Sequence, residues 1–184
     1  MIATPWSSSD YKIVQVDTGW SHAVVLLQHV ETGQGILYGW GRNDKGQLGL
    51  QGKNNNDDDD DDDNDDAATV VLVPTRLPLQ GNVTALSCGS EFTVAVATSW
   101  TLSSRHGGGP QIWTCGWNEH GNLGTLSDGD HSTTWQALPD RLVQPPGTEA
   151  ADDEYVSFPV CIAAGGSHFL AMRVQQQQQQ LDAM

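Results

Sequence analysis

The chain has 184 residues and a formal net charge of −15, with only eight Lys and Arg residues. Nine of the negative charges lie in one segment, residues 57–66, and removing them from −15 leaves −6 for everything else. The basic residues are scattered, so the chain lacks the positive surface that binding to a phosphate backbone requires. Composition therefore argues against direct nucleic-acid binding, while the length suffices for one domain with a hydrophobic core.

Residues 1–10 are predicted to be an N-terminal extension, without the charged start and apolar core of a signal peptide. No apolar run reaches the ~18 residues expected of a membrane span, so we expect no membrane contact. Cys88, Cys115 and Cys161 form neither a disulfide framework nor a CxxC zinc pattern. Because each lies in an apolar stretch, we expect buried, reduced thiols and a cytoplasmic or nuclear location.

The sequence repeats itself. "GRNDKGQLG" at 41–49 returns as "GWNEHGNLG" at 116–124, with five identical positions at a constant offset of 75. Upstream, "VDTGWSHAVVL" at 16–26 is matched by "LSCGSEFTVAV" at 86–96 and by "IAAGGSHFLAM" at 162–172. Self-similarity of this kind is typical of a fold built from repeated structural units.

The spacing between the repeated segments locates insertions. "PTRL" at 74–77 matches "PDRL" at 139–142, and the first connection is longer by ten residues, the length of the acidic segment 57–66. The same comparison predicts loop inserts over 103–111 and 145–155. The Asp run lacks the DxDxDG order and distant Glu of a calcium loop. We expect a disordered, self-repelling insert, with a weak contact to a basic partner as the alternative.

Short apolar or β-branched segments bounded by Gly, Ser or Asn predict strands, and no segment shows a helical period. The predicted strands are 12–16, 23–27, 36–40, 83–87, 93–97 and 112–116. Such spacing predicts an all-β fold, a partial β-propeller of about two to two and a half four-stranded blades.

The predicted organisation follows from the repeats and the insertions. It comprises an extension over 1–10, a first unit over 11–82 with an acidic disordered insert over 54–68, a second unit over 83–159 with loop inserts over 103–111 and 145–155, the start of a third unit over 160–174, and a Gln-rich tail over 175–184.

The segment "GWGRNDKGQLGL" at 39–50 raises the question of a phosphate-binding loop. A Walker loop needs GxxxxGK[ST] and a dinucleotide fingerprint needs GxGxxG. Gly39 and Gly41 supply the first GxG, but position 44 is Asp44. A ligand loop also has no reason to recur in every unit, so we predict no cofactor-binding residue here.

The recurring residues are better explained as structural positions. The glycines would supply positive φ and close strand approach, Leu48 and Leu123 would fill the apolar layer between blades, and Asn43 and Asn118 would tie a turn. The predicted structural repeat positions are Gly19, His22, Gly41, Asn43, Gly46, Leu48, Gly49, Gly89, Gly116, Asn118, Gly121, Leu123, Gly124, Gly165 and His168.

Sequence patterns predict neither catalysis nor a metal site. His22 and His168 occupy the same repeat position, whereas a catalytic or metal site is normally made once. No GxSxG or HExxH motif occurs, and no pair of carboxylates has a placement that the sequence fixes. We therefore expect no enzyme, with no catalytic, cofactor-binding or metal-ligating residue.

A few side chains are candidates for a recognition surface. His120 lies at a turn tip whose residues differ between the two copies; the corresponding positions of the first copy are residues 44–45. We expect a solvated turn there, with a partner contact as the alternative. Trp40, Trp113 and Trp117 are expected in blade cores or rims, with an exposed recognition surface as the alternative.

The segments "GWSHAVVL", "GWGRNDKGQLG" and "CGWNEHGNLG" resemble the repeat family named after the regulator of chromosome condensation. The resemblance covers about residues 11–174 outside the inserts, and it implies a seven-bladed propeller of which this chain holds two units and the start of a third. "CGWNEHG" looks most like the alpha-tubulin suppressor and secretion-regulating exchange-factor groups. The chain departs from the pattern at Phe92, where the other copies carry His22 and His168.

The resemblance implies a non-catalytic scaffold with a protein partner. The alpha-tubulin suppressor group implies the small zinc-binding electron carrier that serves diphthamide synthesis and wobble-uridine modification of tRNA. The alternative is guanine-nucleotide exchange on a small Ran-like GTPase, although no exchange residue can be carried over; a third is a fragment without autonomous function. Because a cut repeat array exposes its edges and apolar faces, we expect self-association if the chain is complete.

Overall fold

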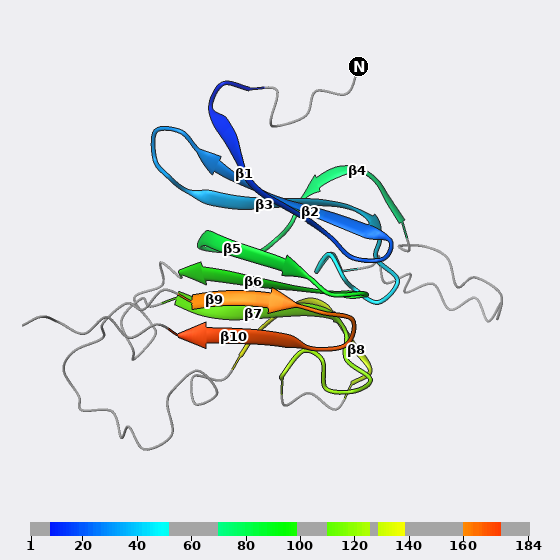
Figure 1. Cartoon of the computed structure of the whole chain (residues 1–184). Coiled ribbons are helices and arrows are strands. Elements are labelled where there is room, and N and C mark those ends of the chain that lie inside the picture. Colours follow the sequence, from blue (N-terminus) through cyan, green and yellow to red (C-terminus); the bar gives the residue numbers. More distant parts are fainter. Residues whose placement is uncertain (1–7, 52–69, 99–109, 126–128, 139–159, 174–184) are drawn as a thin grey trace, which may run out of the picture.

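The computed structural model describes residues 8–51, 70–98, 110–125, 129–138 and 160–173. These residues form three antiparallel sheets, and Figure 1 shows them packed side by side in chain order. The predicted inserts over 54–68 and 145–155 and the tail over 175–184 lie outside the described residues, as does 103–109 of the third insert.

Each sheet is a meander in which strands adjacent in sequence pair with each other. Sheet 1 contains β1 (Tyr11–Thr18), β2 (His22–His29), β3 (Gly35–Arg42) and β4 (Val70–Arg76), sheet 2 contains β5 (Asn82–Cys88), β6 (Phe92–Thr98), β7 (Pro110–Trp117) and β8 (His131–Ala137), and hairpin 3 contains β9 (Val160–Ala164) and β10 (Phe169–Arg173). The six predicted strands are all present and slightly longer than predicted, and the prediction of a partial all-β propeller is confirmed.

The fourth strand of each sheet, β4 or β8, was not predicted from the sequence. Both are edge strands with little buried surface, and β8 reads "HSTTWQA", which lacks an apolar run. An edge strand pairs on one side only and is covered less than its neighbours, which explains the weak hydrophobic signal of β8. This does not apply to β4, which reads "VVLVPTR" and begins with an apolar run.

The match between 74–77 and 139–142 is wrong. The N–H of Leu77 donates to the carbonyl of Leu37, and the N–H of Leu138 donates to the carbonyl of Ile112, both at 2.9 Å. Leu138 therefore takes the position of Leu77, while residues 139–142 lie outside the described residues. The segments that correspond are the Leu-Pro pairs that follow β4 and β8. With this alignment, the connection in the first repeat exceeds that in the second by more than the length of the acidic segment 57–66.

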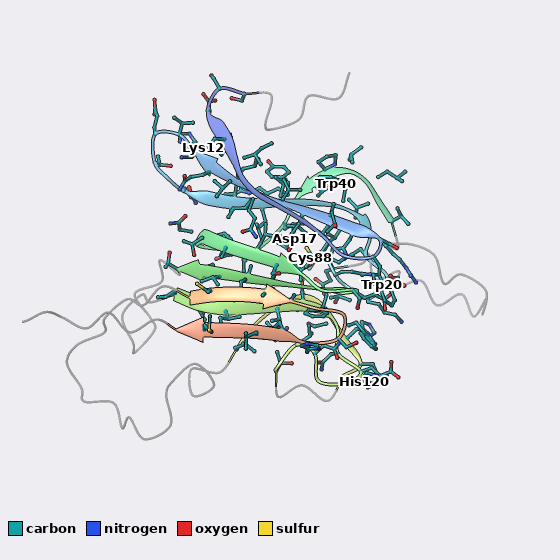
Figure 2. The ribbon with its side chains drawn as sticks, in the orientation of Figure 1. Lys12, Asp17, Trp20, Trp40, Cys88 and His120 are labelled. Carbon is teal, nitrogen blue, oxygen red and sulfur yellow. The ribbon has the colours of Figure 1, made fainter. Side chains whose placement is uncertain are left out.

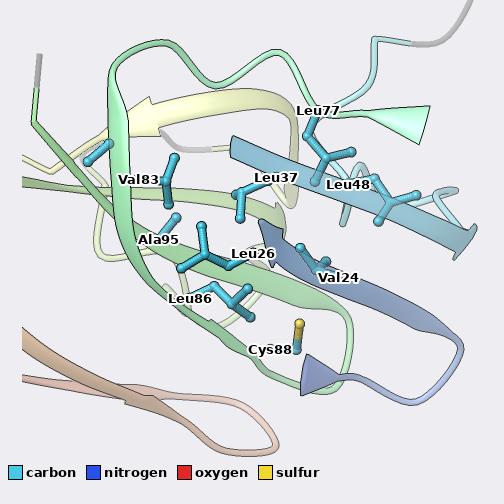
Figure 3. Packing of buried hydrophobic residues seen from close by; sticks show 10 residues of the cluster. Val24, Leu26, Leu37, Leu48, Leu77, Val83, Leu86, Cys88 and Ala95 are labelled. Atoms are coloured by element: carbon cyan, nitrogen blue, oxygen red, sulfur yellow. The ribbon is translucent and has the colours of Figure 1, made fainter. Parts of the chain in front are cut away.

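An apolar layer fills the space between sheets 1 and 2 (Figure 3). It draws Val24, Leu26, Leu37, Leu48 and Leu77 from the first repeat and Val83, Leu86, Cys88, Ala95 and Ala97 from the second. Leu48 is fully buried there although it belongs to a loop and not to a strand. At ~25 cal/mol per Å² of buried apolar surface, this layer is the main force that joins the two sheets.

A second layer joins sheet 2 to hairpin 3 and repeats the arrangement. Its buried members are Phe92, Val94, Val96, Ile112, Leu123 and Leu138, with Ile162, Ala164 and Phe169 of the hairpin packed against them. Leu123 is fully buried and occupies the same place in its layer as Leu48 does in the first.

The repeated asparagine holds the loop that carries the buried leucine. The Oδ1 atom of Asn43 accepts from the N–H of Leu48 at 2.9 Å, and its Nδ2 donates to the carbonyl of Leu50 at 2.9 Å. In the second copy, Asn118 accepts from Leu123 N at 3.0 Å and donates to the carbonyl of Gly129 at 2.9 Å. Both asparagines and both leucines are buried, so these bonds satisfy asparagine side chains and leucine N–H groups that water cannot reach.

Polar contacts between the sheets also recur. The carboxylate of Asp17 accepts from the N–H of Cys88 in sheet 2 at 3.0 Å, and the hydroxyl of Ser87 accepts from the N–H of Ala164 in hairpin 3 at 2.9 Å. Asp17 and Ser87 hold the same repeat position, so each sheet offers a side-chain acceptor to the next sheet from this position.

Two glycines at the same repeat position have different surroundings. Gly46 and Gly121 have φ values of 76° and 75°, where a side chain is strained. A Cβ on Gly46 would lie 2.4 Å from the carbonyl oxygen of Ser132 in sheet 2, whereas a Cβ on Gly121 would meet no described atom within 4 Å. The loop after β3 is thus pressed against the neighbouring sheet, while the described surroundings of the loop after β7 leave room for a side chain.

Substitution of each glycine by alanine separates these two effects. Gly121→Ala should lower the free energy of unfolding by about 1 kcal/mol, the usual cost of an alanine at positive φ. Gly46→Ala should cost clearly more, because its Cβ must also displace sheet 2. Urea denaturation of the two variants measures the difference, and equal losses would show that Gly46 does not press on sheet 2.

Candidate protein-interaction face

One end of the three sheets gathers turns from all three repeats. Because β1 and β3 run in the same direction, the β1–β2 turn lies beside the end of β3, and the N–H of Arg42 donates to the carbonyl of Ser21 at 2.7 Å. In sheet 2 the N–H of Trp117 donates to the carbonyl of Glu91 at 2.9 Å in the same way. We call this end the turn face; it comprises residues 19–21, 89–91 and 165–167 and the loops after β3 and β7.

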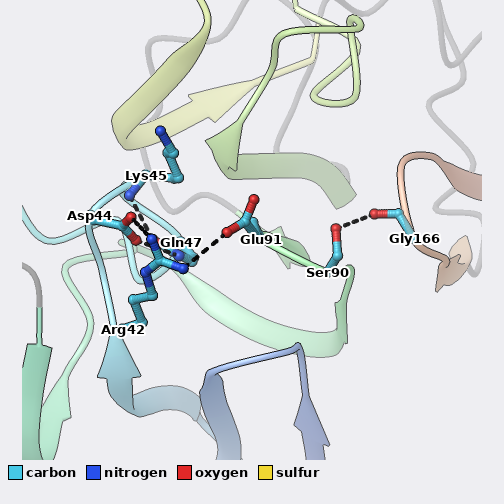
Figure 4. A network of polar contacts seen from close by, with 7 residues as sticks. All are labelled: Arg42, Asp44, Lys45, Gln47, Ser90, Glu91 and Gly166. Carbon is cyan, nitrogen blue, oxygen red and sulfur yellow. Dashed lines mark hydrogen bonds and ion pairs between the residues drawn. The ribbon is translucent and has the colours of Figure 1, made fainter.

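Backbone hydrogen bonds hold the three turns in a row. The N–H of Trp20 donates to the carbonyl of Ser90 at 2.9 Å, and the N–H of Ser90 donates to the carbonyl of Gly166 at 3.3 Å. The Ser90 hydroxyl also donates to Gly166, as Figure 4 shows. These three residues share one repeat position, so the bonds fix the spacing between the turns.

The side chain of Trp20 projects from this row with 78% of its surface exposed. Figure 2 shows it at the same end of the sheets as His120 and at the opposite end from Lys12. The other two copies carry Ser90 and Gly166 at this position. A large apolar residue among small ones at a repeated turn tip was the signal that sequence reasoning missed.

Arg42 connects the first repeat to the second across this face. Its guanidinium forms ion pairs with Asp44 in its own loop and, at 3.4 Å, with Glu91 of the neighbouring turn (Figure 4). Burial opposes ionisation of Asp44, but hydrogen bonds from Gln47 and Arg42 outweigh it and lower the pKa of this carboxyl. The network therefore stays charged and holds Arg42 in one position.

The loop after β7 presents the corresponding part of sheet 2. The ring of Trp117 meets His120 edge-on with centroids 5.2 Å apart, and its Nε1 donates to Glu119 at 3.2 Å. His120 is exposed, as expected for a turn tip. Trp40, Trp113 and Trp117 are all half-buried. Of these three tryptophans, Trp117 borders the turn face, because it is the last residue of β7 and contacts Glu119 and His120 in the loop that follows.

His22 lies buried directly beneath the turns and bonds to the next sheet. Its Nε2 lies 3.1 Å from the hydroxyl of Thr93, and that hydroxyl donates its only proton to the carbonyl of Gln47 at 2.6 Å. His22 Nε2 must therefore be the donor, which makes Nδ1 the unprotonated nitrogen. Nδ1 is buried and has no hydrogen-bond partner among the described residues, as this tautomer allows.

Burial lowers the pKa of His22 from 6.5 to about 4, outweighing the opposite effect of the Asp17 carboxylate. A proton on Nδ1 would create a buried N–H for which none of the described residues accepts a hydrogen bond. The other copies of this position differ, since Phe92 is fully buried and His168 is exposed.

The described residues offer little for covalent or metal chemistry. Among them, no group of three or more His, Cys, Asp or Glu side chains is placed to hold a metal ion, and no helix has the length and hydropathy of a membrane crossing. Burial raises the pKa of Cys88 to about 12 and that of Cys115 well above its usual range, so both are poor nucleophiles. The expectation of burial is wrong for Cys161, which is exposed on β9 because no described sheet covers that face.

Comparisons with known proteins agree with this fold. Residues 34–96 match the family model of the regulator of chromosome condensation (RCC1) repeat. The secretion-regulating guanine nucleotide exchange factor of Mus musculus is 32% identical over 139 residues, which is 74% of this chain and 26% of that protein. The Bos taurus protein of the same name is 33% identical over 131 residues, 70% of this chain and 24% of that protein. The chain thus spans about a quarter of the length of these relatives.

Solved structures show the same architecture. Prp20p of Saccharomyces cerevisiae, described with its binding to Gsp1p and histones, aligns with a TM-score of 0.61 at 20% identity, covering 96% of this chain and 34% of that one. Yeast RCC1 (Prp20) bound by Kap60 gives a TM-score of 0.62 at 21% identity over 96% and 32%. Human WBSCR16 gives 0.57 at 19% identity over 89% and 32%. At these identities the similarity shows the fold.

The state of His22 predicts a pH dependence of stability. The pKa of about 4 in the folded chain is below the 6.5 of an unperturbed histidine, so the unfolded chain binds the proton first as the pH falls. The free energy of unfolding should therefore fall by up to about 3 kcal/mol as the pH is lowered from 6.5 to 4.

The matched control is His22→Gln, which keeps a donor for Thr93 and does not titrate. Thermal unfolding of both proteins between pH 7 and pH 4 should show a steeper loss in the wild type. Parallel curves would mean that His22 is protonated as easily in the folded chain as in the unfolded one.

Proposed function

Because the chain belongs to the RCC1-repeat family, we propose that it is a non-catalytic scaffold whose turn face binds a protein partner. The observation that carries this proposal is the exposure of Trp20, 78%, beside the paired Arg42. Tryptophan and arginine are the residues on which protein interfaces most often depend. With eight basic residues in the chain, a nucleic-acid surface is a weaker alternative.

The turn face is also preorganised for binding. The backbone bonds from Trp20 to Ser90 and from Ser90 to Gly166 set the spacing of the turns. Arg42 is held by two carboxylates before any partner arrives. Groups that are already ordered lose less conformational entropy on binding, which favours affinity. The turn face can therefore present Trp20 as an apolar anchor from a fixed backbone position, with Arg42 and its carboxylates as a charged rim.

We propose two partner classes. The alpha-tubulin suppressor resemblance supports the electron carrier of diphthamide synthesis and wobble-uridine modification. The names of the mouse and bovine relatives support the second candidate function, guanine-nucleotide exchange on a small Ran-like GTPase. Either role is compatible with the predicted location in cytoplasm or nucleus. Neither requires the chain to make or break covalent bonds.

The turn face is tested by removing its anchor. Trp20→Ala should weaken binding to the partner by at least about tenfold, the effect expected of an interface hot spot. Leu72→Ala is the matched control, because Leu72 is an 86% exposed apolar residue on the edge strand β4. Biolayer interferometry against the purified electron carrier and a purified Ran-like GTPase measures both variants. Equal affinities for the two variants would remove the turn face from the proposal.

Nucleotide exchange is tested separately. The full chain is added to the GTPase loaded with fluorescent GDP, and the rate of nucleotide release is followed as the chain concentration rises. Exchange activity predicts acceleration that Trp20→Ala reduces and Leu72→Ala preserves. No acceleration at any concentration would eliminate exchange and leave the scaffold role to the binding experiment.

A further inference from the structure

The two joints between neighbouring sheets use the same pair of positions with opposite chemistry. Between sheets 1 and 2, His22 meets Thr93 through a hydrogen bond of 3.1 Å. Between sheet 2 and hairpin 3, the same positions hold Phe92 and Phe169, which belong to one apolar cluster. A polar residue thus faces a polar one, and an apolar residue faces an apolar one.

Mixed pairs would be unfavourable at this depth. His22 is 4% exposed and Phe92 and Thr93 are fully buried, so water cannot satisfy an unpaired group at these positions. A histidine opposite phenylalanine would bury an N–H without an acceptor, and that cost exceeds the gain from a normal hydrogen bond. The pair therefore discriminates between possible neighbouring sheets.

Hairpin 3 carries residues that correspond to one side of such a joint. His168 has the repeat position of His22 and is exposed, on the same face as Leu170 and Met172. Leu170 is 61% exposed, whereas Val24, at its repeat position in sheet 1, is fully buried by sheet 2. We call His168, Leu170 and Met172 the open face of hairpin 3. The open face corresponds to the faces of sheets 1 and 2 that are buried in the two joints.

We propose that the residues at the His22 and Thr93 positions of neighbouring sheets select which sheets pack together. In this proposal, the open face of hairpin 3 packs against a sheet with Thr or Ser at the position of Thr93, and His168 forms a hydrogen bond with that hydroxyl. A second copy of this chain is a poor partner, because sheet 1 offers Ala23 at that position. Part of the surface around Ala23 is open: Ile13 and Val16 are 54% and 57% exposed, while their counterparts Val83 and Leu86 in sheet 2 are buried. Further along β2, Val25 and Leu27 are already buried in a cluster with Tyr11, Tyr38 and Trp40 of the same sheet.

This mismatch can be repaired in the chain itself. Ala23→Thr supplies the missing hydroxyl, and Ala23→Val is the control with the same shape and no hydroxyl. Ala23→Thr should tighten head-to-tail self-association of the full chain by about fivefold relative to Ala23→Val, the effect of one hydrogen bond. Analytical ultracentrifugation at pH 8 measures the dissociation constants. Adding His168→Ala should abolish the difference.

Equal association of the Thr and Val variants, including none by either, would overturn the fit of His168 to a hydroxyl. A gain that survives His168→Ala would overturn it too. The outcome does not depend on the turn face, so it stands apart from the proposed function.

The joint between sheet 2 and hairpin 3 provides a test that needs no self-association. Phe92→His combined with Phe169→Thr recreates the polar pair, and Phe92→His with Phe169→Val lacks only the hydroxyl. Chemical denaturation should give an equilibrium constant for folding about fivefold larger for the Thr combination. Equal constants would show that the pair does not select its neighbour.

Discussion

Burial of Leu48 between two sheets is the contact on which the rest of the structure depends. Leu48 reaches the layer from a loop, and Asn43 fixes that loop by bonding to its backbone at two points. The same loop brings Gln47 under Thr93 and Asp44 beside Arg42. One asparagine therefore aligns the apolar layer, the buried polar joint beneath the turns and the charged pair on the turn face.

The sequence predicted the first three strands of each four-stranded sheet. Identical spacing in two copies indicated these strands, the asparagine turn and the buried leucines Leu48 and Leu123, because local geometry that both copies share determines these features. The edge strand β8 was missed because its sequence carries no apolar run, whereas β4 was missed although it begins with the apolar run "VVLV". The match at 74–77 failed because a short similarity of sequence does not fix the hydrogen-bond register of an edge strand.

What lies between repeats could not be predicted in the same way. The sequence shows that Phe92 replaces a histidine, but not that Phe169 replaces the threonine it would bond, because the two positions meet only across a joint. Trp20 was overlooked because a repeat search rewards residues that recur, whereas a binding residue is one that does not. The prediction that Cys161 is buried was wrong for a similar reason, because an apolar stretch is buried only where a neighbouring sheet covers it.

The row of turns through Trp20, Ser90 and Gly166 is held mainly by backbone amides and carbonyls. Any non-proline residue supplies the same donor and acceptor, so the identity of the side chain at these tips is decoupled from the geometry that presents it. Sequence change at residue 20 can therefore alter what the surface recognises while the framework stays constant. The same property makes this tip a natural position for a diversified library, because variants would differ in contact chemistry and not in fold.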